Sequence, residues 1–133
     1  MERVSVKYVL DTHAAIWLLE GNAKLGARAR AALEQEERES VALAGISLLE
    51  IAMLAARNVI ALTPNAQTGL RVFADKLTVL PIDSSIAADA VTLALPQRDP
   101  FDRVITATAR AHDLVLITKD RRITKAKVVS TLW

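Results

Sequence analysis

Five acidic residues in this chain have the type and placement to hold a metal ion: Asp11, Glu50, Asp99, Asp102 and Asp120. The chain has no cysteine and only two histidines, so any metal would need oxygen ligands. Carboxylate oxygens suit the hard ions Mg²⁺ and Mn²⁺. Such an ion lowers the pKa of a bound water and shields the charge of a phosphate. These acids, with basic residues nearby and no other candidate nucleophile, indicate hydrolysis of a phosphodiester.

Electrostatics decides whether such a cluster is a functional site. Two carboxylates about 4 Å apart repel each other by roughly 4 kcal/mol at an effective dielectric constant near 20. Three or four of them require either a bound cation or raised pKa values. A cluster of these acids would therefore point to a divalent cation.

The elements that must position the acids alternate along the chain. Apolar, β-branched runs predict strands at 4–10, 41–44, 78–82, 114–118 and 128–131. Amphipathic spacing predicts helices at 14–20, 24–39, 47–57, 65–76, 84–95 and 100–112. This alternation predicts the α/β class, a three-layer α/β/α sandwich around a parallel sheet of four to five strands.

The predicted elements bring the five acids to one edge of the sheet. Asp11 and Asp120 follow strands, and Glu50 lies in the first turn of the helix after the second strand. Asp99 and Asp102 open the helix that leads into the fourth strand. Sheets of this kind bind ligands outside the carboxyl ends of their strands. We therefore expect all five acids at the ligand-binding edge.

Helix capping is the alternative interpretation of the same residues. Ser47 and Glu50 match a capping box, and Asp99 before Pro100 matches an N-cap followed by proline at the first helical position. Asp11 and Asp120 could each cap the segment that follows, and for Asp99 capping is compatible with a metal role. Asp83 also follows a strand, but we expect it only to cap a helix because its strand is placed at the sheet edge.

Composition limits the class of protein. The 133 residues are 52% hydrophobic and 24% charged, as in a soluble globular chain of one domain. No apolar run is long enough to cross a bilayer and no secretion signal is present, so we expect a cytoplasmic protein. Aromatic residues make up 4%, which predicts only a minor part for base stacking. A mean hydropathy of +0.26 suggests that another chain covers some apolar surface.

Four segments in order resemble the PIN-domain family, most closely its VapC-type toxins of prokaryotic toxin–antitoxin pairs. They are Leu10–His13, Ser47–Ala52, Arg98–Ile105 and Leu116–Asp120. The resemblance implies that residues 1–133 form a single PIN domain and a Mg²⁺- or Mn²⁺-dependent endoribonuclease. Asp11, Glu50 and Asp102 would carry the core metal site, Asp120 a second metal or outer waters, and Asp99 an accessory acid.

The same resemblance implies further contacts. Thr12 and Thr118 would position waters, and RNA phosphates would be bound by basic residues near the sheet edge: Arg103, Lys119, Arg121 and Arg122. His13 is either a substrate contact or a helix-start residue. An antitoxin protein would inhibit the enzyme, bound as a helix in a groove formed by part of the apolar residues Ile16–Leu19, Leu48, Leu49, Met53 and Leu54. Homodimers are usual in the family.

Two other functions remain open. A receiver-like signalling module also gathers carboxylates and Mg²⁺ at strand ends, but receivers pair two acids after the first strand, whereas Asp11 stands alone before Thr12. A PIN-like binding protein without activity is the other alternative. It is disfavoured because none of the core acids is replaced.

Overall fold

A five-stranded parallel sheet forms the centre of the computed structural model, which describes residues 5–133. The strands are β1 (Tyr8–Leu10), β2 (Val41–Ala44), β3 (Thr78–Leu80), β4 (Val115–Ile117) and β5 (Thr131–Leu132), and their order is β3-β2-β1-β4-β5. In register, Leu10 of β1 lies beside Leu43 of β2 on one side and Ile117 of β4 on the other. The carboxyl ends of the three central strands are therefore level.

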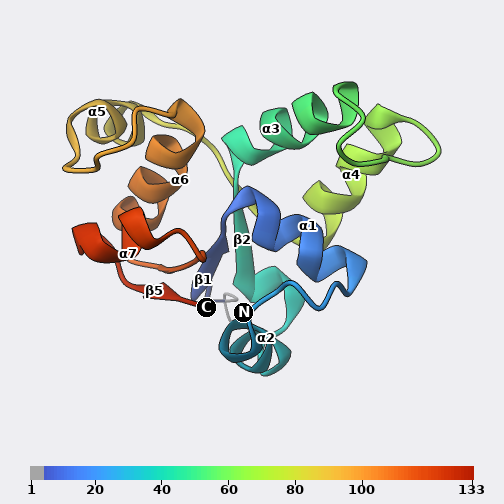
Figure 1. Ribbon diagram of the computed structural model, residues 1–133, viewed down its shortest axis with the longest axis horizontal. Coiled ribbons are helices and arrows are strands. Elements are labelled where there is room, and N and C mark those ends of the chain that lie inside the picture. The colour runs from blue at the N-terminus through green and yellow to red at the C-terminus, as the bar shows by residue number, and fades with distance from the viewer. Residues whose placement is uncertain (1–4) are drawn as a thin grey trace.

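Helices cover both faces of this sheet, as Figure 1 shows. They are α1 (Thr12–Glu20), α2 (Ala27–Glu34), α3 (Gly45–Ala56), α4 (Ala66–Lys76), α5 (Ser84–Thr92), α6 (Pro100–Ala111) and α7 (Arg121–Ala126), with a 3-10 turn η1 at Arg38–Ser40. The first four helices pack on one face, and α5, α6 and α7 pack on the other. The predicted three-layer α/β/α sandwich is confirmed.

The alternation of side chains along β1 explains the two layers. Val9 points into the core under α5, α6 and α7, whereas Leu10 points into the core under α1 to α4. Leu116 and Ile117 of β4 divide in the same way. Successive strand residues face opposite sides of a sheet, so a strand that is apolar throughout is buried on both faces.

The structure corrects several predicted boundaries. The first strand was predicted from Val4, which lies outside the described residues, and β1 begins at Tyr8. The helix predicted over 24–39 is the shorter α2 followed by η1. Helix α7 was not predicted, since its six residues bury only Ile123 and carry no amphipathic repeat. No helix within residues 5–133 is long and apolar enough to cross a membrane.

Candidate active site

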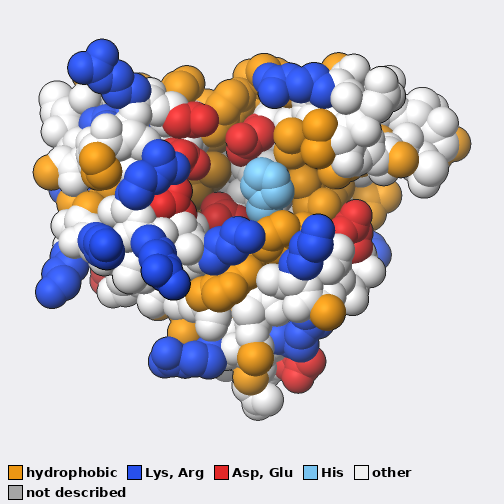
Figure 2. Space-filling view, in the orientation of Figure 1, with side chains coloured by type: hydrophobic (Ala, Val, Ile, Leu, Met, Phe, Trp, Pro, Cys, Tyr) orange, Lys and Arg blue, Asp and Glu red, His pale blue; other side chains and the backbone are white. Residues whose placement is uncertain are grey.

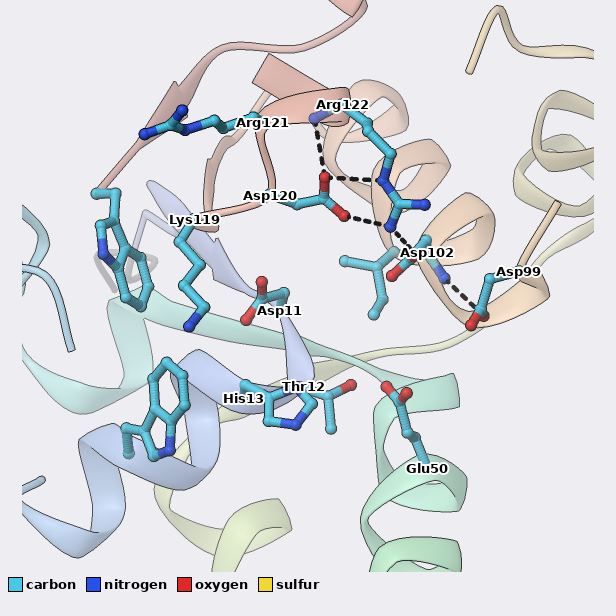
Figure 3. A pocket seen from close by; sticks show the side chains of 13 residues that line it. Asp11, Thr12, His13, Glu50, Asp99, Asp102, Lys119, Asp120, Arg121 and Arg122 are labelled. Carbon is cyan, nitrogen blue, oxygen red and sulfur yellow. Dashed lines mark hydrogen bonds and ion pairs between the residues drawn. The ribbon is translucent and has the colours of Figure 1, made fainter. Parts of the chain in front are cut away.

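All five candidate acids line one pocket of about 710 Å³. The pocket lies past the carboxyl ends of β1 and β4, where α1 and α7 begin, and α3 and α6 supply its other acids. Figure 2 shows red carboxylates gathered in a hollow beside a histidine, with Lys and Arg side chains around it. Figure 3 shows Asp11, Glu50, Asp99, Asp102 and Asp120 directed toward that hollow, which we call the acidic pocket.

Three of these acids also cap the helices that carry them. Asp11 accepts a hydrogen bond from the Ala14 N–H at 2.8 Å at the start of α1. Asp99 accepts one from the Phe101 N–H at 2.8 Å at the start of α6. Asp120 accepts one from the N–H of the second residue of α7 at 2.9 Å. Capping and a place in the pocket therefore coexist, since all three carboxylates line the pocket while they cap.

Asp83 behaves as predicted, since it caps α5 outside the acidic pocket. Its carboxylate accepts a hydrogen bond from the Ile86 N–H at 2.8 Å. Its strand, β3, lies at the edge of the sheet, away from the central strands that end at the pocket. Asp83 thus provides a matched control for the capping acids of the pocket.

The predicted capping box at Ser47 and Glu50 is wrong. Helix α3 begins at Gly45, directly after β2, and its N-cap is Ala44. Ser47 is buried and accepts a hydrogen bond from the Thr12 hydroxyl at 3.0 Å. Glu50 consequently lies in the second turn of α3, where it lines the acidic pocket without capping anything.

Burial and mutual repulsion raise two of the carboxyl pKa values. Desolvation raises the pKa of Asp11, although hydrogen bonds from the Ala14 N–H and the Thr118 hydroxyl oppose this. For Asp102, desolvation and then the negative charges of Asp99, Asp120 and Glu50 raise the pKa to about 6. The pocket therefore carries negative charge that the protein compensates only in part.

One guanidinium group compensates part of this negative charge. Arg122 forms an ion pair with Asp120 at 3.0 Å, and the same nitrogen lies 3.9 Å from Asp102. Its hydrogen bonds lower the pKa of Asp120. Figure 3 shows this arginine reaching across the top of the pocket toward both carboxylates. A cation that binds between these two acids would compete with Arg122.

The donor set fits a hard divalent cation, but the ligands are not drawn together. Every acidic side chain of the pocket offers carboxylate oxygens, which Mg²⁺ and Mn²⁺ prefer. Across residues 5–133, no three His, Asp or Glu side chains are close enough to form a metal site as they stand. The repulsion that raises the pKa of Asp102 is the physical reason for carboxylates to remain apart.

Three of the four predicted phosphate-binding residues line the pocket: Lys119, Arg121 and Arg122. Arg103 lies outside the pocket lining, and its contact with RNA stays a prediction. All five of its N–H groups donate to backbone carbonyls, two at the end of α5 (Ala90 and Val91) and three in the following loop (Leu93, Leu95 and Gln97). Arg103 therefore fixes the loop that leads to Asp99.

The two predicted hydroxyl residues have structural partners. Thr12 lines the pocket and donates to Ser47. Thr118 is buried, accepts a hydrogen bond from the Asp120 N–H at 3.1 Å and favours the charged form of Asp11. Both therefore position the protein groups that surround the pocket, and their predicted contact with water stays a prediction.

The sequence did not single out Gln97 or Trp133. Buried Gln97 donates to Asp120 at 3.4 Å, and its Oε1 has no hydrogen-bond partner among residues 5–133. Trp133 lines the acidic pocket together with Trp17 and His13. The sequence did not predict this arrangement, because a low aromatic content does not show where the few aromatic residues lie in the fold.

The predicted partner-binding residues divide in the structure. Ile16 is core, whereas Trp17, Leu18, Leu19, Leu48, Met53 and Leu54 are half-buried. Leu49 is 57% exposed on α3. An apolar surface on α3 therefore exists, and its centre is Leu49.

The fold is that of a PIN domain, and the chain belongs to the PIN domain family, whose model matches residues 8–129. It is 38% identical over 118 residues to ribonuclease VapC22 of Mycobacterium tuberculosis, an alignment that covers 86% of this chain and 88% of that protein. The receiver-like alternative is accordingly set aside.

Solved structures show the same fold. VapBC2 from Rickettsia felis, crystallised with a DNA fragment from its promoter, matches with a TM-score of 0.70 and 16% identity, over 96% of this chain and 98% of that one. A toxin–antitoxin complex from Klebsiella pneumoniae matches with a TM-score of 0.68 and 24% identity, over 94% and 97%. At these identities the likeness concerns the backbone architecture.

Proposed function

We propose that this protein is a metal-dependent endoribonuclease and that the acidic pocket is its active site. The observation that carries the proposal is the convergence of five carboxylates, from four separate parts of the sequence, in one pocket of a PIN domain. The relative from Mycobacterium tuberculosis, named a ribonuclease, supports RNA as the substrate.

Asp11, Glu50 and Asp102 are the proposed core ligands of Mg²⁺ or Mn²⁺, with Asp120 and Asp99 beside them. A bound ion would lower the pKa of a water and offset the charge of the phosphate during an in-line displacement. The carboxylates of Asp11 and Asp102 are suited to this task because the protein compensates their charge only in part. Ion binding would relieve the repulsion that raises the pKa of Asp102.

The basic side chains around the pocket would hold the substrate. In hydrolysis the water oxygen bonds to phosphorus, the bond from phosphorus to the leaving ribose oxygen breaks, and that oxygen takes up a proton. Lys119 and Arg121 line the pocket and would hold the phosphate while this occurs. Arg122, already beside Asp102 and Asp120, would keep the loop of Asp120 in place until an ion enters.

An antitoxin protein is the proposed partner. The similar structures from Rickettsia felis and Klebsiella pneumoniae are of toxin–antitoxin proteins. The exposed Leu49 lies one residue before Glu50 on α3, so a helix bound over this surface would reach the rim of the acidic pocket. Inhibition would follow from exclusion of RNA.

Cleavage of RNA in the presence and absence of Mn²⁺ tests the proposal. Total cellular RNA is incubated with the wild type, Asp11→Asn and Asp83→Asn, and the new ends are mapped. Both substitutions replace a capping aspartate by asparagine, which caps helices about equally well. We expect metal-dependent cleavage by the wild type and Asp83→Asn, and none by Asp11→Asn.

Two outcomes would reject the assignment. Cleavage by Asp11→Asn at the wild-type rate would place the active site elsewhere. Absence of cleavage by a folded wild type with either ion would instead support the alternative that this PIN domain is a binding protein without activity.

A further inference from the structure

Part of the lining of the acidic pocket is aromatic. It is formed by His13, Trp17 and Trp133, which we call the aromatic wall. The ring centroids of Trp17 and Trp133 are 5.9 Å apart at an interplanar angle of 63°, and those of His13 and Trp17 are 5.7 Å apart. The chain has only two tryptophans, and both are in this wall.

Helix α1 and the approach of Trp133 to Gly26 place the wall beside the acids. His13 and Trp17 are four residues apart on α1, so they share the helix face that follows the Asp11 cap. Trp133 is seated against Gly26, where an added Cβ would lie 2.7 Å from the indole Cδ1. Only glycine permits this approach, which fixes the indole at the pocket.

The wall also carries positive charge. The Lys119 ammonium lies 4.9 Å from the Trp17 ring centroid, and the Lys24 ammonium lies 6.0 Å from it. Lys119 directly precedes Asp120, and Figure 3 shows it beside Asp11 on the side of the pocket away from Asp99. A ligand that combines a flat aromatic ring with a phosphate fits this combination of indoles and an ammonium group.

We propose that the aromatic wall is a nucleobase subsite: a base adjacent to the scissile phosphate stacks on the wall while Lys119 pairs with its phosphate. This inference rests on the proposed ribonuclease function, since it places RNA in the acidic pocket. His13 is exposed, and Trp17 and Trp133 are half-buried, so each indole packs on the core with one part of its ring and leaves the rest for a ligand. Stacking on indole tolerates any base because every base has a π-face.

Intrinsic tryptophan fluorescence gives a direct test, because no tryptophan lies outside the wall. The full chain is titrated in EDTA, so that no cleavage occurs, with single-stranded hexa-adenylate RNA and with an abasic hexamer of the same ribose phosphates. We expect the adenylate to quench the emission and to bind roughly 5- to 150-fold more tightly than the abasic hexamer. Both should show the same dependence on salt, since they carry the same phosphates.

Variants separate stacking from charge. Trp133→Leu keeps an apolar side chain and should bring the affinity for adenylate close to that for the abasic hexamer. Lys119→Gln should weaken both oligonucleotides equally and reduce the salt dependence, whereas Lys76→Gln, on α4 outside the pocket, should change neither. The comparison of the two hexamers on the wild type needs no variant to fold.

The outcomes distinguish the subsite from the catalytic function. Equal affinity for the two hexamers, without quenching by adenylate, would overturn the nucleobase subsite even if RNA is cleaved with Mn²⁺. Quenching and tighter binding of adenylate by a protein that cuts no RNA would support the subsite and reject the nuclease. If the fluorescence responds only to a bound protein partner and to neither hexamer, the wall is a protein-docking surface and the proposal fails.

Discussion

Removal of the Asp102 charge should stabilise the folded protein at neutral pH and have little effect at acidic pH. In the folded state this carboxyl has a pKa of about 6, raised from 3.8, so it holds its proton more tightly than in the unfolded chain. Between these two pKa values the folded state therefore binds more protons. The contribution of Asp102 to the free energy of unfolding is therefore fully present below pH 4, where its carboxyl is protonated. It falls as the pH rises and is lost above pH 6.

The structure gives the magnitude. A rise from 3.8 to about 6 corresponds to about 3 kcal/mol at pH values above 6. The Asp102 side chain is 29% exposed, and solvent screening reduces this to roughly 1.5–3 kcal/mol. Asp102→Asn keeps the shape of the side chain and cannot ionise. The free energy of unfolding of Asp102→Asn should exceed that of the wild type by about that amount at pH 7.5. At pH 4 the two values should agree within about 0.5 kcal/mol.

Urea unfolding at both pH values, in EDTA, measures this difference. In thermal unfolding at neutral pH, we expect Asp102→Asn to raise Tm by about 5–12 °C for a chain of this size. Asp83→Asn, outside the acidic pocket, reports what an Asp to Asn exchange at a helix start does by itself. A gain for Asp102→Asn that is the same at both pH values, or a loss at neutral pH, would refute the argument that crowded carboxylates destabilise the pocket.

Three further outcomes are expected. Arg103→Lys should lower the free energy of unfolding in urea by about 2–4 kcal/mol, because lysine cannot replace five hydrogen bonds to carbonyls. The RNA affinity of the folded fraction should stay unchanged. Weaker RNA binding with full stability would instead place Arg103 in the substrate site. Arg122→Gln should tighten Mn²⁺ binding, measured by calorimetry, roughly 1.5- to 5-fold, because it removes a competing cation from Asp120. An equal effect of Arg121→Gln would show that only the net charge of the pocket matters. Millimolar Mn²⁺ should raise the Tm of the wild type by mass action and raise that of Asp11→Asn less, and identical shifts would exclude Asp11 as a ligand.

The fold was predictable because its signals are local. Apolar runs bounded by polar residues predict the five strands, and the rule that parallel strands end at one edge predicts that the acids lie together. Helix α7 escaped prediction because its six residues bury one side chain, Ile123, and are too few to show a repeat. Ser47 was misread because β2 passes into α3 without a turn, so the helix begins two residues earlier than its polar residue suggests.

The parts of the site that depend on distant contacts were not predictable. Arg103 has the sequence context of a phosphate ligand, yet the end of α5 and the loop after it offer carbonyl groups to every donor. The place of Trp133 depends on Gly26, which is far from it in sequence and leaves room for its ring. Neither the contacts of Arg103 nor the approach of Trp133 to Gly26 produces a recognisable pattern in the sequence.

Asp11, Asp99 and Asp120 each cap a helix and line the acidic pocket, and this pair of roles determines how such a protein can lose its activity. Each begins a helix, a position where asparagine serves as well as aspartate. Of the three, Asp11 is a proposed core ligand, so exchange of one of its carboxylate oxygens for an amide nitrogen would remove a metal ligand and keep the helix cap. If the proposed function holds, an inactive form that still folds is one substitution away, and the same substitution gives a variant for crystallising uncut RNA.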